Sequence, residues 1–221
     1  MIMKALVVYG GWDGHQPKEV AAIYSEFLER NGFTVTVSDT LDAYATEDLT
    51  TYRLIVPIWT MGTITPEQLN PLLAAVKGGV GIAGCHGGMC DSFRMETEYQ
   101  FMTGGQWVSH PGDSGVNYTV DIRVPDHFIT SGSPNMFTVV SEQYYMHVDP
   151  AVHVLATTRF PVADGPHLRN GVVDMPVVWT KWYGNGRVSY NGLGHDTTVV
   201  SQPEVLRLLE RGCLWAAGVA H

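Results

Sequence analysis

The chain has 221 residues, of which 45% are hydrophobic and 16% charged. Such a chain can bury enough apolar surface to fold without a disulfide or a structural metal, and we predict a single α/β domain over residues 1–221. The formal net charge of −9 argues against a protein that binds nucleic-acid phosphates or an anionic membrane surface. A small polar or neutral ligand is the expected partner.

The cysteines indicate a reducing compartment. There are three of them, Cys85, Cys90 and Cys213, an odd number without the spacing of a zinc site. The apolar N-terminus lacks a small-residue cleavage pattern, so we interpret it as a first strand. No apolar run approaches the roughly 20 residues that a membrane helix needs. We therefore expect a cytoplasmic protein without a membrane partner.

The first half of the chain alternates apolar runs with amphipathic stretches. Runs that end in glycine or in a polar loop predict buried strands, and stretches that begin at proline and end at glycine predict helices. This alternation implies a mainly parallel sheet with right-handed crossovers, a flavodoxin-like three-layer α/β sandwich. The predicted strands are 5–9, 33–37, 53–58 and a fourth that starts at Val80, with helices from Pro17 to Asn31 and from Pro66 to Gly78.

After Met89 the pattern changes. Residues 90–115 are rich in glycine and are predicted to be irregular, whereas 116–124 alternate apolar and polar side chains. That period of two predicts a strand with one wet face, antiparallel or at a sheet edge, and an exposed edge would allow a homodimer. The second half therefore adds an antiparallel hairpin region. Its other predicted elements are strands at 137–140, 152–157 and 175–182, a hairpin turn at Asn185-Gly186, and a final helix from Pro203.

Three histidines follow predicted strand ends. His15 comes after the first strand, His86 after the fourth and His195 after the hairpin strand. In an open α/β sheet such positions meet at the carboxyl edge, where ligands bind. A lone histidine is more often simply hydrogen-bonded in the interior, but the shared location favours a catalytic site. Neutral imidazoles beside a carboxylate also suit a divalent metal such as Zn²⁺, although no short-range His or Cys spacing supports one.

Further polar and aromatic residues are candidates for the same site. Glu142 lies between two predicted strands beside Tyr144 and could act as an acid or base, or else belong to a strand edge with stacked aromatics. Aromatic faces beside polar groups are typical of a sugar pocket, although a tryptophan is more often part of a core. The residues predicted to bind substrate are Trp12, Trp59, Trp107, His110, Tyr144 and Asp196.

The turn after the fourth strand resembles the nucleophile elbow of class I glutamine amidotransferases, whose pattern is G-x-nucleophile-x-G. Centring on His86 gives Gly84-Cys85-His86-Gly87-Gly88 with both glycines, whereas centring on Cys85 loses the first. The better register places an imidazole where the thiol would be, and imidazole does not form a thioester. Glutaminase chemistry is therefore disfavoured. The later Gly194-His195-Asp196 likewise lacks the Pro-Glu that follows the histidine of those enzymes.

Several motifs together resemble the ThuA-like (trehalose-utilisation) family, a branch of the glutamine amidotransferase-like fold. The resemblance runs over nearly the whole chain, with one departure at Phe128, where the family usually has proline. It implies that fold and a role in the use of disaccharides such as trehalose and its 3-keto derivatives. The matching stretches are Gly14-His15, Gly84-Cys85-His86-Gly87-Gly88, Ser109-His110-Pro111, Asp126 to Thr130, Glu142-Gln143-Tyr144, Pro176 to Thr180, and Gly184 to Asp196.

Three functions remain open from the sequence. The first is a carbohydrate-acting enzyme in which His86 and His15 polarise or deprotonate a sugar oxygen, with or without a metal, and Glu142 and His195 assist. The second is a sugar-binding accessory subunit without catalysis, and the third is a hydrolase or amidotransferase that uses Cys85. No dinucleotide fingerprint is present, because Gly10-Gly11-Trp12-Asp13-Gly14 lacks the required third glycine, so NAD is not an expected cofactor.

Overall fold

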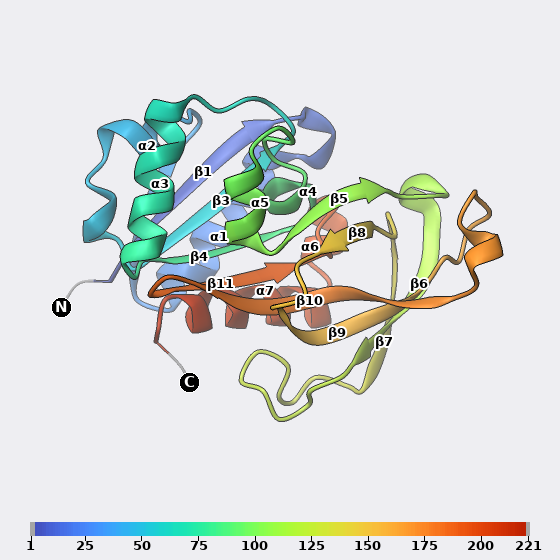
Figure 1. The fold of residues 1–221 in the computed structure, drawn as a ribbon. Helices are drawn as coiled ribbons and strands as arrows, with labels where there is room; N and C mark the ends of the chain where they lie inside the picture. Colours follow the sequence, from blue (N-terminus) through green and yellow to red (C-terminus); the bar gives the residue numbers. More distant parts are fainter. Residues whose placement is uncertain (1–2, 220–221) are drawn as a thin grey trace.

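One mixed sheet of nine strands runs through residues 3–219, the part of the chain that the computed structural model describes (Figure 1). The strand order is β2-β1-β3-β4-β11-β10-β9-β6-β7, and β5 and β8 form a separate antiparallel pair. The strands are β1 (Met3–Gly11), β2 (Phe33–Ser38), β3 (Leu54–Thr60), β4 (Gly81–Cys85), β5 (Gly105–Ser109), β6 (Val116–Ile122), β7 (Met136–Ser141), β8 (Tyr145–Val148), β9 (His153–Phe160), β10 (Val173–Tyr183) and β11 (Gly186–Asn191).

The sheet has a parallel half and an antiparallel half that share β11. Strands β2, β1, β3, β4 and β11 are parallel, and every pairing from β11 through β10, β9 and β6 to β7 is antiparallel. Tyr183 pairs with Gly186 across the turn between β10 and β11, which confirms the hairpin predicted at Asn185-Gly186. The predicted α/β class with an added antiparallel region is therefore confirmed.

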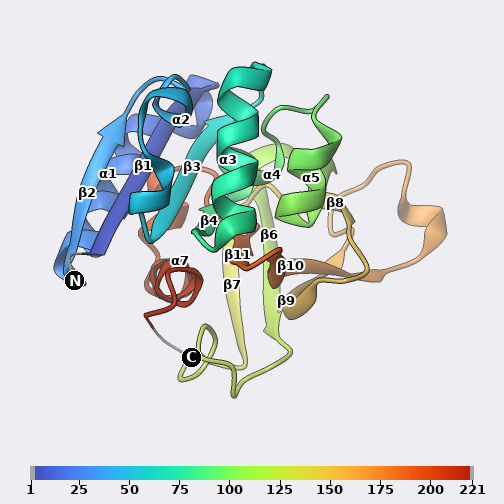
Figure 2. The same ribbon diagram turned by 60° about the vertical axis from the view of Figure 1, so that its left-hand side comes forward.

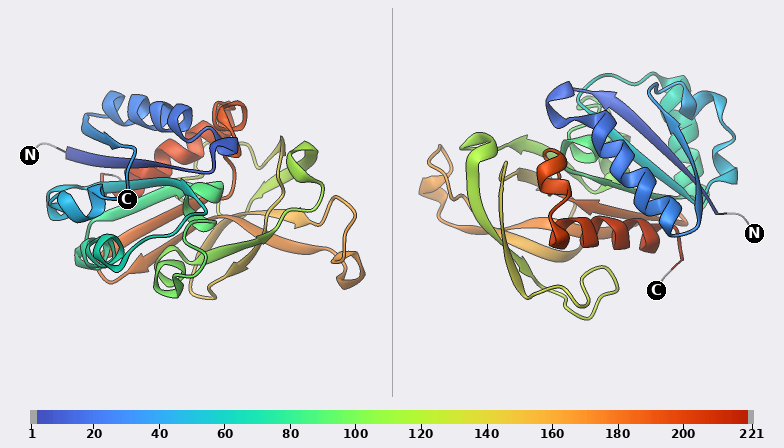
Figure 3. Two further views of the ribbon diagram at one scale, coloured as in Figure 1. Left: turned by 90° about the horizontal axis from the view of Figure 1, so that it is seen from above. Right: turned by 180° about the vertical axis from the view of Figure 1, so that it is seen from behind.

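Helices cover both faces of the parallel half (Figures 2 and 3). On one face lie α1 (Pro17–Arg30) and α7 (Pro203–Ala216), and on the other lie α2 (Ala43–Thr46), α3 (Pro66–Gly78) and α5 (Thr97–Thr103). Two short helices, α4 (His86–Cys90) and α6 (Thr197–Val200), follow strand ends. The helix α3 begins with a capping box in which Thr65 and Gln68 satisfy each other's backbone amides. No helix within residues 3–219 is long and apolar enough to cross a membrane.

The alternation of side chains along the central strands creates two cores. Ala5 and Val7 of β1 pack beneath α1 and α7, whereas Leu6 and Val8 face α3 on the opposite side of the sheet. Because both faces are covered, these strands are continuous apolar runs rather than alternating ones. This is why the sequence predicts β1, β3 and β4 as buried parallel strands.

One prediction about the middle of the chain is wrong, and another holds in only one of its two alternatives. Residues 90–115 are not irregular, since they contain α5 and β5; neither is signalled by a long periodic stretch, and β5 is ordered by pairing with β8. The 116–124 segment is an antiparallel strand, as one of the two alternatives has it, but it is not at an edge, because β6 pairs with both β7 and β9. Its wet face results from the uncovered side of the sheet, and β7 forms the edge instead. The edge argument for a homodimer therefore no longer applies to this segment.

Candidate metal and sugar site

Four potential ligands meet at the carboxyl edge of the parallel strands. His15 ends the 3₁₀ turn Asp13–His15 after β1, His86 begins α4 directly after β4, and His195 follows β11. Glu142 reaches them from the antiparallel half, where it follows β7. One ligand atom from each of these residues lies within 4.8 Å of the others. The convergence of the three histidines therefore agrees with what the strand order predicts, and the carboxylate completes the group.

One oxygen of Glu142 lies at the centre of this cluster. Its Oε2 is 3.0 Å from Nε2 of His86, 3.5 Å from Nδ1 of His195 and 3.8 Å from Nε2 of His15. Burial alone would raise the pKa of Glu142, but the contacts with His15, His195 and His86 outweigh it and hold that pKa well below its usual range. The carboxylate is therefore ionised.

The hydrogen bonding of His86 leaves a lone pair directed at that carboxylate. Its Nδ1 lies 2.8 Å from the carbonyl oxygen of Gly192, which can only accept, so Nδ1 carries the proton. Burial lowers the pKa of His86 to about 4, and the imidazole is neutral at neutral pH. Two acceptors, Nε2 of His86 and Oε2 of Glu142, then face each other at 3.0 Å. A cation bound by both atoms would remove the repulsion between these two acceptors.

The other two imidazoles also present unused nitrogens. Nδ1 of His15 is hydrogen-bonded to the Thr60 hydroxyl at 2.8 Å, whereas His15 Nε2 and His195 Nδ1 are buried without a hydrogen-bond partner. The close Glu142 carboxylate raises the pKa of His195. Tetrahedral Zn²⁺ with bonds of about 2.0–2.2 Å places neighbouring ligand atoms about 3.3–3.6 Å apart. The contacts of 3.0–3.8 Å to Glu142 bracket that spacing, and all four ligand atoms lie within 4.8 Å of one another, so the residues could hold a divalent ion.

His110 approaches the same carboxylate but is not a fourth imidazole ligand. Its Nδ1 lies 3.7 Å from Glu142 Oε2, yet that nitrogen accepts a hydrogen bond of 3.1 Å from the indole of Trp107. Its lone pair is therefore already used. The ring also lies nearly parallel to that of Tyr144, which places His110 in the wall of the site rather than at its centre.

A pocket of about 420 Å³ opens over the cluster, within the range usual for small-ligand sites. Its walls combine three aromatic residues with polar and charged groups, a mixture that is usual in ligand pockets. It contains the predicted Trp12, Trp107, His110 and Tyr144. The lining residues are Trp12, His15, Met61, Asp91, Arg94, Trp107, His110, Asp113, Ser114, Glu142, Tyr144 and His195.

Three predicted site residues lie outside that lining. The indole of Trp59 packs over Gly10 and Gly62, where an added Cβ would lie within 3 Å of it. Asp196 caps α6 by accepting a hydrogen bond of 3.0 Å from the Val199 amide. His86 is only 1% exposed and lies beneath Tyr144, with ring centroids 3.8 Å apart. In this geometry His86 can hold a metal, but Tyr144 separates it from the pocket.

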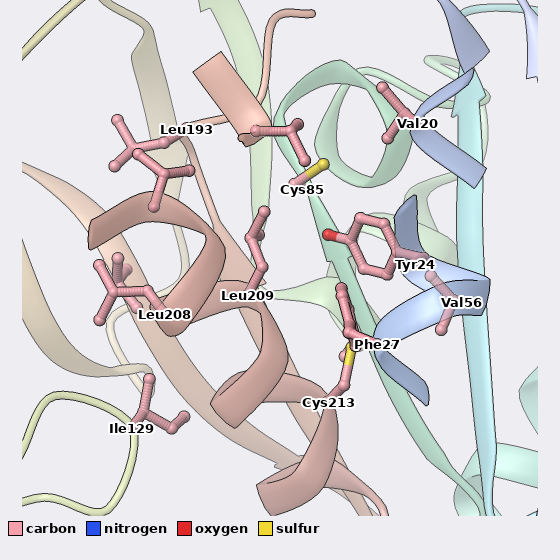
Figure 4. Close-up of a cluster of buried hydrophobic side chains, with 14 of the residues drawn as sticks. Val20, Tyr24, Phe27, Val56, Cys85, Ile129, Leu193, Leu208, Leu209 and Cys213 are labelled. Atoms are coloured by element: carbon pink, nitrogen blue, oxygen red, sulfur yellow. The ribbon is translucent and has the colours of Figure 1, made fainter. Parts of the chain in front are cut away.

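The turn at His86 has the elbow geometry, and it directs Cys85 away from the pocket. His86 adopts a left-handed backbone with φ of 48°, whereas Cys85 remains extended. The Cys85 thiol points into the core toward Tyr24, near Leu209 and Cys213 (Figure 4). Burial raises the pKa of Cys85 to about 11. A reactive thiolate at this position is therefore disfavoured.

We expect Cys85 to resist alkylation in the folded protein. At pH 8 a thiol with a pKa of about 11 is ionised to roughly one part in a thousand, and Cys90 and Cys213 are buried as well. Iodoacetamide should therefore modify the native protein far more slowly than the protein in guanidinium, as measured by mass spectrometry. Rapid and selective labelling of Cys85 would instead support the hydrolase alternative.

Sequence reasoning missed Asp91 and Arg94, which line the pocket from the segment after α4. Their only signal is that the segment follows the glycine turn.

Backbone strain is a second signal of the site, and it is visible only in the structure. Within residues 3–219 the non-glycine residues with positive φ all line the site or lie next in sequence to a lining residue or ligand, and strain of this kind gathers at functional sites. They are Gln16, Met61, His86, Phe93 and Asp113.

Comparison with known proteins decides the family. The family model described as ThuA, trehalose utilisation, matches residues 4–216. The chain belongs to the ThuA family. A search of curated proteins gave no match. Among solved structures, a ThuA-like protein from Parabacteroides merdae is 19% identical with a TM-score of 0.78, covering 98% of this chain and 90% of its own.

Two further structures share the ThuA fold of this chain. A ThuA-like protein from Bacteroides uniformis is 18% identical with a TM-score of 0.78, covering 97% of this chain and 91% of its own. A protein from Salmonella typhimurium described as cytoplasmic is 12% identical with a TM-score of 0.63, covering 97% of this chain and 99% of its own. At these identities the likeness is one of fold, and the site rests on the geometry described above.

Proposed function

We propose that this ThuA-family protein is a carbohydrate-acting enzyme of disaccharide utilisation, with a trehalose-type or keto-disaccharide substrate. The observation that carries the proposal is the convergence of His15, His86 and His195 on one oxygen of Glu142 at the base of an aromatic-walled pocket. These four residues would hold a divalent ion such as Zn²⁺. When bound, the ion would supply a Lewis acid that polarises a sugar oxygen or lowers the pKa of a bound water.

Other residues of the site would bind and orient the sugar. Trp12 and Trp107 would bind the apolar faces of sugar rings through their indoles. Burial raises the pKa of Tyr144 well above its ordinary value, so its hydroxyl stays protonated and would donate a hydrogen bond to a sugar oxygen. The pKa of Glu142 is held well below its usual range, so this carboxylate would serve as an anionic ligand of the ion rather than as a base. His86, beneath Tyr144, would hold the ion beside Glu142.

A second candidate is a sugar-binding accessory subunit without catalysis. The observation in its favour is that His86 occupies the elbow position and Cys85 is turned into the core, so the amidotransferase nucleophile is missing. This candidate predicts saturable sugar binding without any product. We place either form in the cytoplasm as a protein that binds neither nucleic acid nor membrane, in keeping with three free buried cysteines and the net charge of −9.

The deciding experiment measures product formation from trehalose and from 3-keto-trehalose by the zinc-loaded protein. We expect turnover of at least one sugar, abolished by a chelator and lowered about 100-fold or more by His86→Ala, which removes a ligand and the link to Gly192. Turnover that persists unchanged in His86→Ala would overturn the assignment. Saturable binding of either sugar without product would favour the accessory subunit.

A further inference from the structure

We propose that Arg94, clamped by Asp91 above the indole of Trp107, makes the pocket selective for a disaccharide by binding the sugar ring that does not react. This inference rests on the proposed function and names a specificity-determining residue for it. The guanidinium lies 4.5 Å from the centre of the Trp107 ring, and both residues line the pocket. The cation therefore lies over one face of the indole, and the two side chains stack in the pocket wall.

The contacts of Arg94 fix its guanidinium and leave one edge unused. Nε donates to Oδ1 of Asp91 at 2.6 Å, and Nη2 donates to Oδ2 at 2.9 Å. Among residues 3–219, Asp91 is the one hydrogen-bond partner of this guanidinium. The remaining edge carries two parallel N–H groups, one on each terminal nitrogen. That spacing suits two acceptors on neighbouring atoms, which vicinal sugar hydroxyls provide.

The charge balance favours a neutral ligand over a phosphorylated one. Asp91, whose side chain is only 4% exposed, neutralises Arg94 directly. The pocket also contains Glu142 and Asp113, so its carboxylates outnumber its single guanidinium. Because Asp91 already balances the positive charge of Arg94, the guanidinium would orient a ligand through hydrogen bonds and would add little attraction for an anion. The ligand class that matches this wall is an uncharged, polyhydroxylated ring.

The exposure of the side chains places Arg94 at the opening of the pocket and the histidine cluster at its base. The side chains of His15 and Glu142 at the base are 8% and 7% exposed, whereas that of Arg94 is 44% exposed at the rim. Trp107 lies between them in the wall, oriented by its hydrogen bond to His110. A ligand that contacts both the cluster and the free guanidinium edge must extend from base to rim. A disaccharide does so with one ring at each end.

The test compares trehalose with glucose by isothermal titration calorimetry on zinc-loaded wild type, Arg94→Met and Arg94→Lys. We expect both variants to weaken trehalose binding about 10-fold or more, because the forked edge is lost, and to change glucose binding less than about 2-fold. Arg159→Met is the matched control, since Arg159 forms an exposed pair with Asp174 outside the pocket. It should leave both affinities unchanged.

A purely structural Arg94–Asp91 pair would give a different result. It would change both sugars equally, or neither, and either outcome overturns the inference while leaving the proposed function in place. Because Arg94→Met strands a buried carboxylate, the double variant Asp91→Asn/Arg94→Gln provides a folded alternative with a neutral pair and the same expected selectivity loss. If the wild type binds neither sugar, the proposed function fails together with the inference.

Discussion

Replacing Glu142 by Gln should abolish zinc binding without weakening the metal-free protein. In the wild type, the ionised Oε2 faces the lone pair of His86 Nε2 at 3.0 Å. A glutamine side chain can turn its NH₂ group toward that nitrogen and donate a hydrogen bond. The substitution therefore removes an anionic ligand and also relieves a contact between two acceptors. We expect zinc affinity to fall about 100-fold or more, and the melting temperature without metal to stay level or rise.

Thermal unfolding with and without zinc measures both effects. An ion present at about 100 times its Kd stabilises the folded state by ~2.7 kcal/mol, which corresponds to roughly 5–10 °C for a domain of this size. The wild type should show that shift, and Glu142→Gln should not. Glu98→Gln is the matched control, because Glu98 is exposed and only accepts a hydrogen bond from Tyr183. A full zinc shift in Glu142→Gln would show that the cluster is not a metal site.

The parallel half of the fold could be predicted because its strands and helices are signalled by residues within each segment of the chain. Strands β1, β3 and β4 are buried on both faces, so each is an unbroken apolar run, and proline and capping residues mark the helix starts. The segment from 90 to 115 could not be predicted in the same way. There β5 is ordered by pairing with β8, about 40 residues further along the chain, and no periodicity within the segment reports that pairing.

The same distinction applies to the site. His15, His86 and His195 could be predicted because each follows a strand, and parallel strands bring their carboxyl ends together. Neither Asp91 nor Arg94 could be found, since their place in the wall depends on how the chain leaves α4. Trp59 shows the opposite kind of error, because the sequence predicts it in the site and it lies outside the pocket. It stands near the end of β3, much as Trp12 follows the end of β1, but its indole fills the space above Gly10, and composition cannot distinguish a packed ring from an exposed one.

Gly87→Ala should impair the site although Gly87 is neither a ligand nor part of the pocket lining. A Cβ at this position would lie 2.7 Å from Cε1 of His15 and 2.9 Å from Cγ2 of Thr60. His15 cannot move away freely, because its Nδ1 is hydrogen-bonded to Thr60 and its ring packs against Trp12. The imidazole must therefore rotate or shift, and Nε2 with it. We expect zinc affinity to fall about 10-fold or more, since metal ligands tolerate distance errors of only about 0.2 Å.

The position of Gly87 makes this a test of geometry rather than of backbone strain. Gly87 belongs to α4 and does not have a positive φ, so alanine suits its backbone. Gly78→Ala at the end of α3 is the matched control, because a Cβ there meets nothing within 4 Å. Both variants should fold, and only Gly87→Ala should lose zinc affinity in a competition titration with a coloured chelator. Equal zinc affinity in the two would mean that His15 contributes no ligand. The cluster would then consist of His86, His195 and Glu142 alone.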